Sequence, residues 1–360
     1  MRPTVKLGAT ALAAAALCGV VAAAPASAGF EPPRAGPLDR GSVEEPFRDS
    51  VIEDGAATTS AAAKASRAAR APNDYLDLHG HSVTVEVSDR YAPDPAADQD
   101  LVDFLGTLAH GGEMSRLTVV VLTPGELSEL CGAQALACYG SRNGRMFISG
   151  DGSQSGQAPL EFVVAHEYGH HVAAARDNSP WSAFEWGTKR WASYERVCPG
   201  VRAGDYHPGA QGQHYYSNPG EAFAEAFAEG HYPGLVRWDW DERLKPDDAA
   251  LGAIFADVAS PWRGPTTIER QGKLPAGGAR TDVSEVDMPL DGRLTAELSA
   301  PGDADFDLYL TSAGGKDLAR STNRGSDERV RYTICGRRSV GVAAYRHKGG
   351  GRFATETLRP

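Results

Sequence analysis

The sequence predicts an α+β domain followed by an all-β sandwich. Between residues 75 and 262, runs that alternate like strands are interspersed with longer runs of helical spacing, which is typical of an α+β domain. Residues 263–280 are rich in turn-forming residues and mark a linker. From 281 to 360, short alternating runs such as Phe306–Leu310 are separated by turn residues, and this pattern favours a β-sandwich.

The first domain is expected to begin with strands and short helices. Ser82–Val87 alternates apolar and polar residues, and Leu117–Leu122 is an apolar run of strand length. Asp98–His110 has a polar start and helical spacing and is followed by two glycines, which predicts a helix. Another short helix is expected from Thr123 to Leu130, and a further strand at Arg145–Ser149. This order predicts a small mixed sheet.

The N-terminus has the features of a secretory signal. Arg2 and Lys6 precede an apolar run, and the small residues that end at Ala28 resemble a cleavage site, so residues 1–28 are predicted to be removed on export. Residues 29–74 are rich in Pro, Gly, Ala, Ser and Arg and show no periodicity, and we interpret them as a flexible leader or propeptide. The protein is therefore expected to be secreted and extracellular.

Charge and hydropathy argue against two classes of partner. The formal net charge is −11 at pH 7, which disfavours binding to nucleic acid and to anionic membrane surfaces. Beyond the signal, no apolar run has the length that spans a bilayer, so no integral membrane segment is expected.

The cysteines indicate disulfides. Exported proteins meet oxidising conditions, and Cys131, Cys138, Cys198 and Cys335 all lie beyond the predicted cleavage site. The spacing of Cys131 and Cys138 does not resemble a zinc knuckle, so we predict that these two residues form a disulfide. A bond between Cys198 and Cys335 would have to join the two domains, and this pairing stays open.

The segment His166-Glu167-Tyr168-Gly169-His170 contains the pattern H-E-x-x-H within a run of helical character. Residues four apart share one face of a helix, so the imidazoles of His166 and His170 can reach one metal ion. A glutamate beside the first histidine can act as general base for a metal-activated water. The pattern predicts a hydrolytic Zn²⁺ site with His166 and His170 as ligands and Glu167 as the base.

A third ligand is expected from a later helix. An extended motif with a third histidine would need glycine at 173 and histidine at 176, where the chain has Ala173 and Arg176. Catalytic zinc usually has three protein ligands. Glu221 and Glu225 share one face of a second predicted helix. Glu221 therefore fits the position of the third ligand. Glu225 fits the position of a carboxylate that contacts a ligand and not the metal itself.

The other histidines are not assigned to the metal. His171 is turned about 100° away from the ligand face of the helix, and we interpret it as structural or solvent-facing. His79, His81 and His110 fit no ligand pattern.

His166–His170 together with Asn218–Phe227 resembles the motifs of the gluzincin metallopeptidases, and most of all those of the catalytic domain of anthrax lethal factor and its relatives. The resemblance implies a zincin-like metallopeptidase domain in which Glu221 is a zinc ligand and Glu225 orients a histidine. In that family a proton-donating tyrosine lies seven residues before the ligand glutamate, whereas this chain has His214 there.

The group that stabilises the transition state therefore stays open among three neighbours. His214 offers an imidazole at the expected position, and Tyr215 and Tyr216 offer hydroxyl groups directly beside it. Any of the three is able to donate a hydrogen bond to a developing oxyanion.

The C-terminal stretch resembles the bacterial pre-peptidase C-terminal domain, through Pro301–Leu310 and Val340–Tyr345. That domain is a β-sandwich appended to many secreted peptidases. The resemblance implies that residues 281–360 bind an extracellular surface or the substrate.

Together these patterns predict a secreted zinc metalloendopeptidase that acts on a protein or peptide substrate. Glu167 would take a proton from the attacking water and deliver it to the leaving amine. An edge strand at Met146–Ser149 is expected to pair with an extended peptide. Two alternatives remain open: a secreted binding or adhesion protein with a degenerate metal site, and a zinc amidase that acts on cell wall.

Overall fold

The computed structural model of the chain describes residues 69–360, except 134, 153–156 and 337. The predicted signal (1–28) and most of the predicted leader (29–74) lie outside the described residues. The end of that leader belongs to the fold, because Asn73 and Asp74 open strand β1 (Asn73–Leu76) and pair with Val85 and Thr84. The predicted boundary at 74 is thus a few residues too late.

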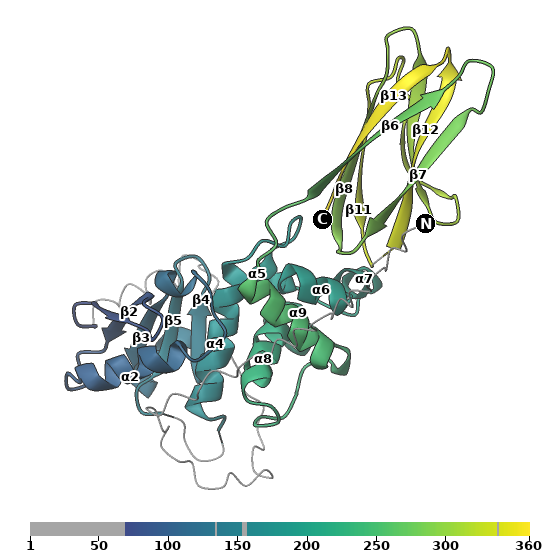
Figure 1. Cartoon of the computed structure of the whole chain (residues 1–360). Coiled ribbons are helices and arrows are strands. Elements are labelled where there is room, and N and C mark those ends of the chain that lie inside the picture. Colours follow the sequence, from purple (N-terminus) through teal and green to yellow (C-terminus); the bar gives the residue numbers. More distant parts are fainter. Residues whose placement is uncertain (1–68, 134, 153–156, 337) are drawn as a thin grey trace, which may run out of the picture. The chain divides into compact units, whose positions relative to one another are not determined.

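The first part of the chain builds a mixed five-stranded sheet in the order β1-β2-β3-β5-β4 (Figure 1). The other strands are β2 (Ser82–Val87), β3 (Thr118–Leu122), β4 (Ala137–Gly140) and β5 (Arg145–Ser149). Strands β2, β3 and β5 run parallel, and β1 and β4 pair antiparallel at the two edges. The structure confirms the α+β character of this region.

The expectation of an edge strand at Met146–Ser149 is wrong. β4 pairs along β5, with Cys138 opposite Phe147, and so covers the edge that we expected to be open. The disulfide between Cys131 and Cys138 joins β4 to the end of the preceding helix. This predicted disulfide is confirmed, and it holds the short β4 strand in a position where it closes the sheet.

The helices of this region are α2 (Pro95–Leu105), α3 (Pro124–Cys131), α4 (Leu160–Ala174), α5 (Ala183–Trp186), α6 (Lys189–Tyr194), α7 (Val197–Ala203), α8 (Pro219–His231) and α9 (Asp248–Ala259), with short 3₁₀ turns η1 (Met114–Arg116), η2 (Tyr215–Ser217) and η3 (Glu242–Leu244). The helix expected at Asp98–His110 begins earlier, at a proline after the capping residue Asp94, and ends at Leu105. α3 starts as expected, since Thr123 and Glu126 form a reciprocal capping box.

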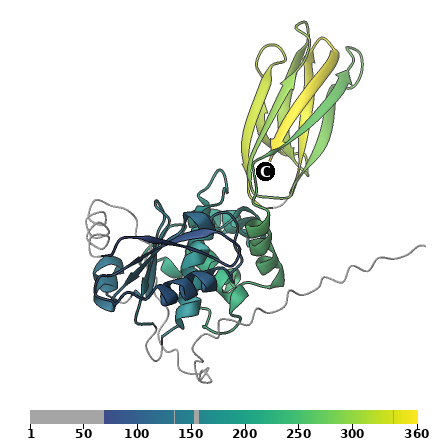
Figure 2. The same cartoon turned by 60° about the vertical axis from the view of Figure 1, so that its left-hand side comes forward.

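The C-terminal part is a sandwich of two four-stranded antiparallel sheets, β10-β9-β12-β7 and β11-β8-β13-β6 (Figures 1 and 2). The strands are β6 (Thr266–Leu274), β7 (Thr281–Met288), β8 (Gly292–Ser299), β9 (Asp305–Ser312), β10 (Asp317–Ser321), β11 (Glu328–Ile334), β12 (Arg338–Lys348) and β13 (Gly351–Arg359). Apolar side chains from both sheets, such as Leu294 and Phe306, share one core.

The predicted linker at 263–280 is partly wrong. Nine of its residues form β6, which pairs with β13 from Thr266 to Leu274. Most side chains of β6 are exposed or half-buried, so its sequence lacks a strong apolar alternation. Its strand conformation comes from the backbone ladder with β13, which the local pattern did not reveal.

A second disulfide links Cys198 on α7 to Cys335, directly after β11. The pairing that the sequence left open is therefore present.

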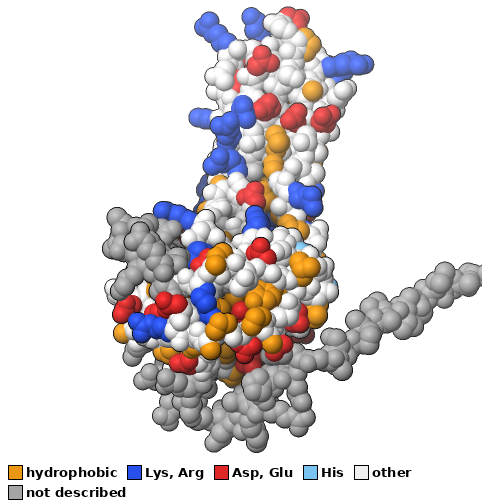
Figure 3. Space-filling view, turned by 90° about the vertical axis from the view of Figure 1, so that its left-hand side faces the viewer, with side chains coloured by type: hydrophobic (Ala, Val, Ile, Leu, Met, Phe, Trp, Pro, Cys, Tyr) orange, Lys and Arg blue, Asp and Glu red, His pale blue; other side chains and the backbone are white. Residues whose placement is uncertain are grey.

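Within the part of the chain that the structure describes, no helix combines the length and apolar character that crossing a bilayer requires. Acidic and basic side chains are interspersed on the face seen in Figure 3.

Candidate metal centre

Two helices bring the candidate site together, and Gly169 sets how closely they pack. A Cβ atom on Gly169 of α4 would lie 2.8 Å from the Cα atom of Ala224 and 3.2 Å from the Cβ atom of Phe227, both on α8. Glycine is therefore required where these two backbones cross. Asn218 caps α8 by accepting a hydrogen bond from the Gly220 N–H, which places Glu221 in the first turn of that helix.

His166, His170 and Glu221 form a buried group with the geometry of a metal site. The Nε2 atoms of His166 and His170 lie 3.6 and 3.3 Å from the same oxygen, Oε2, of Glu221. The three donor atoms lie within 4.8 Å of one another. Zinc bonds of 2.0–2.1 Å in tetrahedral geometry place ligand atoms about 3.3 Å apart, so the three donors fit such an ion.

Burial supports the same interpretation. The exposed fractions are 0% for His166, 1% for His170 and 1% for Glu221, and two further carboxylates, Glu167 and Glu225, are 0% and 1% exposed beside them. Buried carboxylates need a positive partner, and a divalent cation held by two imidazoles would supply it. The group is therefore a candidate metal-binding site.

Glu225 lies behind His166, as expected for a residue that orients a ligand. Its Oε2 atom is 2.9 Å from Nδ1 of His166, so the imidazole N–H donates to the carboxylate and the Nε2 atom faces Glu221 in the candidate metal group. Burial raises the pKa of Glu225, and the hydrogen bond from His166 opposes that shift. The pair fixes both the tautomer and the angle of the ring.

Glu167 lies in the same buried region on α4, and its charge contributes to raising the pKa of Tyr139, although burial is the larger cause. The ring of Tyr139 also lies parallel to that of His170, with 6.4 Å between ring centres. Trp240 and Phe184 lie beside His166 and His170, with ring-centre distances of 6.0 and 5.5 Å. Aromatic rings thus surround the group and keep its polar atoms in a region of low polarity.

Of the three proposed transition-state donors, the structure brings Tyr215 to the group. Its hydroxyl lies 3.4 Å from Oε2 of Glu221, the oxygen that also faces both histidines. Tyr216 packs against Tyr215 and Trp240. His214 is exposed and stacks on His207, with 3.9 Å between the ring centres. The side chain of His214, which has the position of the family's tyrosine, therefore faces away from the group, and the neighbouring Tyr215 contacts it.

His171 is structural, and the solvent-facing interpretation is wrong. The residue is 3% exposed, and its Nε2–H donates to the carbonyl oxygen of Glu113 at 2.9 Å. Its Nδ1 then accepts from the Tyr139 hydroxyl at 2.9 Å, since a neutral imidazole has one donor and one acceptor. Burial lowers the pKa of His171, which keeps this neutral form. The ring joins α4 to β4 and to Glu113, the residue before η1.

Two features that concern possible metal sites were missed by sequence reasoning. One is the close approach at Gly169, which a glycine inside an otherwise helical run could have suggested. The other is a second group of possible metal ligands, Asp77, His81 and His110. The alternation Asp77-x-His79-x-His81 was visible in the sequence, but His110 joins it only in the folded chain.

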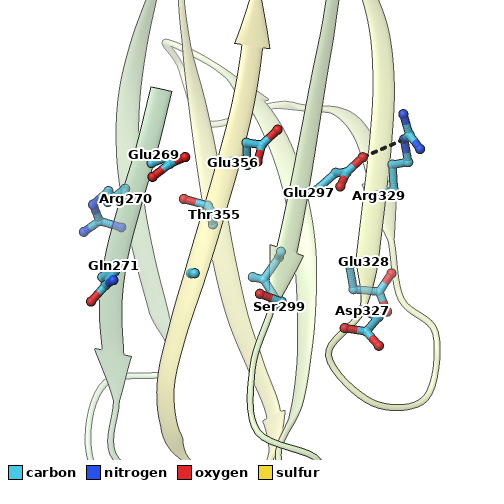
Figure 4. A pocket seen from close by; sticks show the side chains of 12 residues that line it. Glu269, Arg270, Gln271, Glu297, Ser299, Asp327, Glu328, Arg329, Thr355 and Glu356 are labelled. Carbon is cyan, nitrogen blue, oxygen red and sulfur yellow. Dashed lines mark ion pairs between the residues drawn. The ribbon is translucent and has the colours of Figure 1, made fainter. Parts of the chain in front are cut away.

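The sandwich carries a hollow over the sheet β11-β8-β13-β6 (Figure 4). Its lining is rich in carboxylates, which include Glu269, Glu297, Asp327 and Glu356. Glu297 forms an ion pair with Arg329 at 3.0 Å. Arg270 and Arg329 lie among these carboxylates, so the lining carries side chains of both charges.

No family model matches the chain, and no curated protein matches it in sequence. Among solved structures, the pre-peptidase C-terminal domain of a collagenase from Bacillus anthracis matches 26% of this chain and 88% of its own, with 17% identity and a TM-score of 0.23. The Yersinia pseudotuberculosis-derived mitogen matches 27% of this chain and 87% of its own, with 15% identity and a TM-score of 0.21. At these scores the likenesses carry no argument, and the sandwich architecture rests on the strand pairing described above.

Proposed function

We propose that this chain is a secreted zinc-dependent peptidase of the gluzincin type, which hydrolyses peptide bonds in a protein or peptide substrate. The observation that carries the proposal is the convergence of two helices on one carboxylate oxygen. Oε2 of Glu221 lies 3.3–3.6 Å from the two Nε2 atoms of an H-E-x-x-H helix. In this proposal His166, His170 and Glu221 hold the zinc ion.

A bound zinc ion would polarise the scissile carbonyl and lower the pKa of a water molecule beside it. Glu167 follows His166 on α4 and is fully buried, and we assign to it the proton of the attacking water. It then delivers this proton to the leaving amine. A site with a purely structural ion has no use for such a base.

Two further side chains complete the proposed machinery. Glu225 accepts the Nδ1–H of His166 and holds that ring at the angle the zinc ion needs. Tyr215 directs its hydroxyl at the ligand set, and we assign to it the hydrogen bond that stabilises the oxyanion of the tetrahedral intermediate. His214 and Tyr216 then shape the surroundings and do not touch the reacting atoms.

The proposed activity is tested with two candidate substrates, casein and purified cell wall. Purified protein, stripped with a chelator and reloaded with zinc, should cleave casein, and the stripped protein should not. If the protein releases peptides from cell wall and does not cleave casein, the result would favour the zinc amidase over the peptidase. If the zinc-loaded protein cleaves neither casein nor cell wall, the enzyme proposal is overturned in favour of a binding or adhesion protein.

A further inference from the structure

A second set of metal-ligating side chains lies at the turn between β1 and β2. The Oδ2 atom of Asp77 is 3.1 Å from Nδ1 of His81 and 3.7 Å from Nε2 of His110. The three donor atoms lie within 4.8 Å of one another. These separations bracket the value of about 3.3 Å that tetrahedral zinc geometry gives.

The turn fixes the orientation of the Asp77 carboxylate. Its Oδ1 atom accepts the backbone N–H groups of His79 and His81 at 2.8 and 2.7 Å, so the other oxygen faces the two imidazoles. Gly80, with a φ of +84°, permits this tight turn, and its N–H donates to the carbonyl of Asp77 at 3.1 Å. Asp77 is buried, with 6% of its surface exposed.

His110 reaches the turn from the loop after α2, and this loop is held on both sides. The N–H of Ala109 donates to Nε2 of His231 at 3.2 Å, and the N–H of Gly111 donates to Oε1 of the buried Glu113 at 2.6 Å. The side chain of His110 is 8% exposed. The donor set is thus held by its surroundings before any ligand binds, as built metal sites require.

Hydrogen bonding alone explains only part of this arrangement. The 3.1 Å contact between Asp77 and His81 is an ordinary hydrogen bond, whereas the 3.7 Å between Asp77 and His110 is too long for one. A single ion between the three side chains accounts for both separations.

We infer that Asp77, His81 and His110 bind a divalent first-row transition-metal ion, which fastens the β1–β2 turn to the loop after α2. One carboxylate oxygen and two imidazole nitrogens suit zinc and its neighbours, whereas calcium and magnesium prefer sets made of oxygen. The exposed His79 stands beside the set, with its ring centre 5.0 Å from that of His110, and is the neighbouring side chain in position to add a fourth ligand.

The test is the zinc content of the full chain after removal of metal by a chelator and reloading with Zn²⁺ alone. We expect two equivalents in the unchanged protein and one in the double variant His81→Ala, His110→Ala. The variant His166→Ala, His170→Ala should also bind one equivalent, and the combination of both should bind none. His347→Ala, which removes an exposed histidine of β12, is the matched control and should leave two equivalents.

Equal zinc content in the unchanged protein and in the His81→Ala, His110→Ala variant would overturn the inference. Failure of the zinc site in the peptidase proposal would appear instead as equal zinc content in the unchanged protein and in the His166→Ala, His170→Ala variant. The two outcomes are therefore distinguishable. A second readout guards against misfolding of the double variant. In the His166→Ala, His170→Ala background, Co²⁺ should give visible absorption bands that the milder change His110→Gln abolishes, and persistence of those bands would contradict the site.

Discussion

Replacing Gly169 by alanine should push α8 away from α4 and weaken the metal group. The new Cβ atom would lie 2.8 Å from Cα and 3.1 Å from the carbonyl oxygen of Ala224, whereas ordinary contacts begin at 3.4 Å. These atoms are backbone, so α8 itself must move, by roughly 0.6 Å if contact is to be restored. Metal–ligand distances tolerate only about 0.2 Å. Glu221 on α8 should then fit the two histidines of α4 less well.

We expect Gly169→Ala to destabilise the metal-free protein by about 1–3 kcal/mol, the usual cost of overpacking a core. Zinc affinity should fall by about 10–100-fold, as for other changes that displace ligands indirectly. Denaturant unfolding of the stripped protein measures the first effect, and a zinc titration against a competing chelator measures the second.

Gly252→Ala is the matched control for this experiment. Gly252 is an exposed residue of α9, and a Cβ atom there would meet nothing within 4 Å. Alanine favours the helix at such a position by about 0.5–1 kcal/mol, so this variant should be slightly more stable than the unchanged protein. Stability and zinc affinity of Gly169→Ala that equal those of the unchanged protein would refute the packing argument.

Three further predictions concern other parts of the chain. Tyr215→Phe should keep its zinc and lose about 10²–10³-fold in kcat for casein, whereas Tyr216→Phe should stay near full activity; equal losses would contradict the choice of donor. Burial raises the pKa of Glu195 from 4.5 to about 7, so its contribution to stability is fully present below pH 4.5 and is lost as the pH rises through 7. Unfolding curves of Glu195→Gln should therefore change less between pH 4.5 and 7 and show greater stability at pH 7.5, and an unchanged pH dependence would rule this out. The disulfide between Cys198 and Cys335 spans 137 positions, so the chain-entropy model assigns it about 5 kcal/mol; replacing both by serine should lower Tm strongly, and an unchanged Tm would count against the bond.

Much of the candidate site was predictable because it depends on local spacing. Two residues four apart on a helix share a face whatever the rest of the fold does, so His166 with His170 and Glu221 with Glu225 were expected to act in pairs. The meeting of the two pairs depends on the packing at Gly169, which spacing does not reveal. The sequence therefore predicted the members of the candidate metal group better than the contacts around them.

The choice among the three possible donors shows the same limit. His214 has the position that the family motif favours, but it lies just before the turn η2 and its ring stacks on His207. Tyr215, the first residue of η2, has its hydroxyl beside Glu221. A shift of one residue in a 3₁₀ turn rotates a side chain by about 120°, and no sequence pattern determines that rotation.

The fold was predicted where the apolar pattern is strong and missed where pairing with a neighbour alone makes the strand. β3 and β9 carry buried apolar residues and were expected. β6 is mostly exposed, and β4 is only four residues long, so both depend on a neighbouring strand for their conformation. The missed β4 is also the reason that β5 was mistaken for an edge.

The zinc content and casein hydrolysis of two single variants test the central claim most directly. Glu221→Ala removes a ligand, so it should lose one zinc equivalent and its activity together. Glu167→Gln removes only the base, so it should bind as much zinc as the unchanged protein while turnover falls by about 10²–10⁴-fold. Full zinc content in Glu221→Ala, or full activity in Glu167→Gln, would contradict the account.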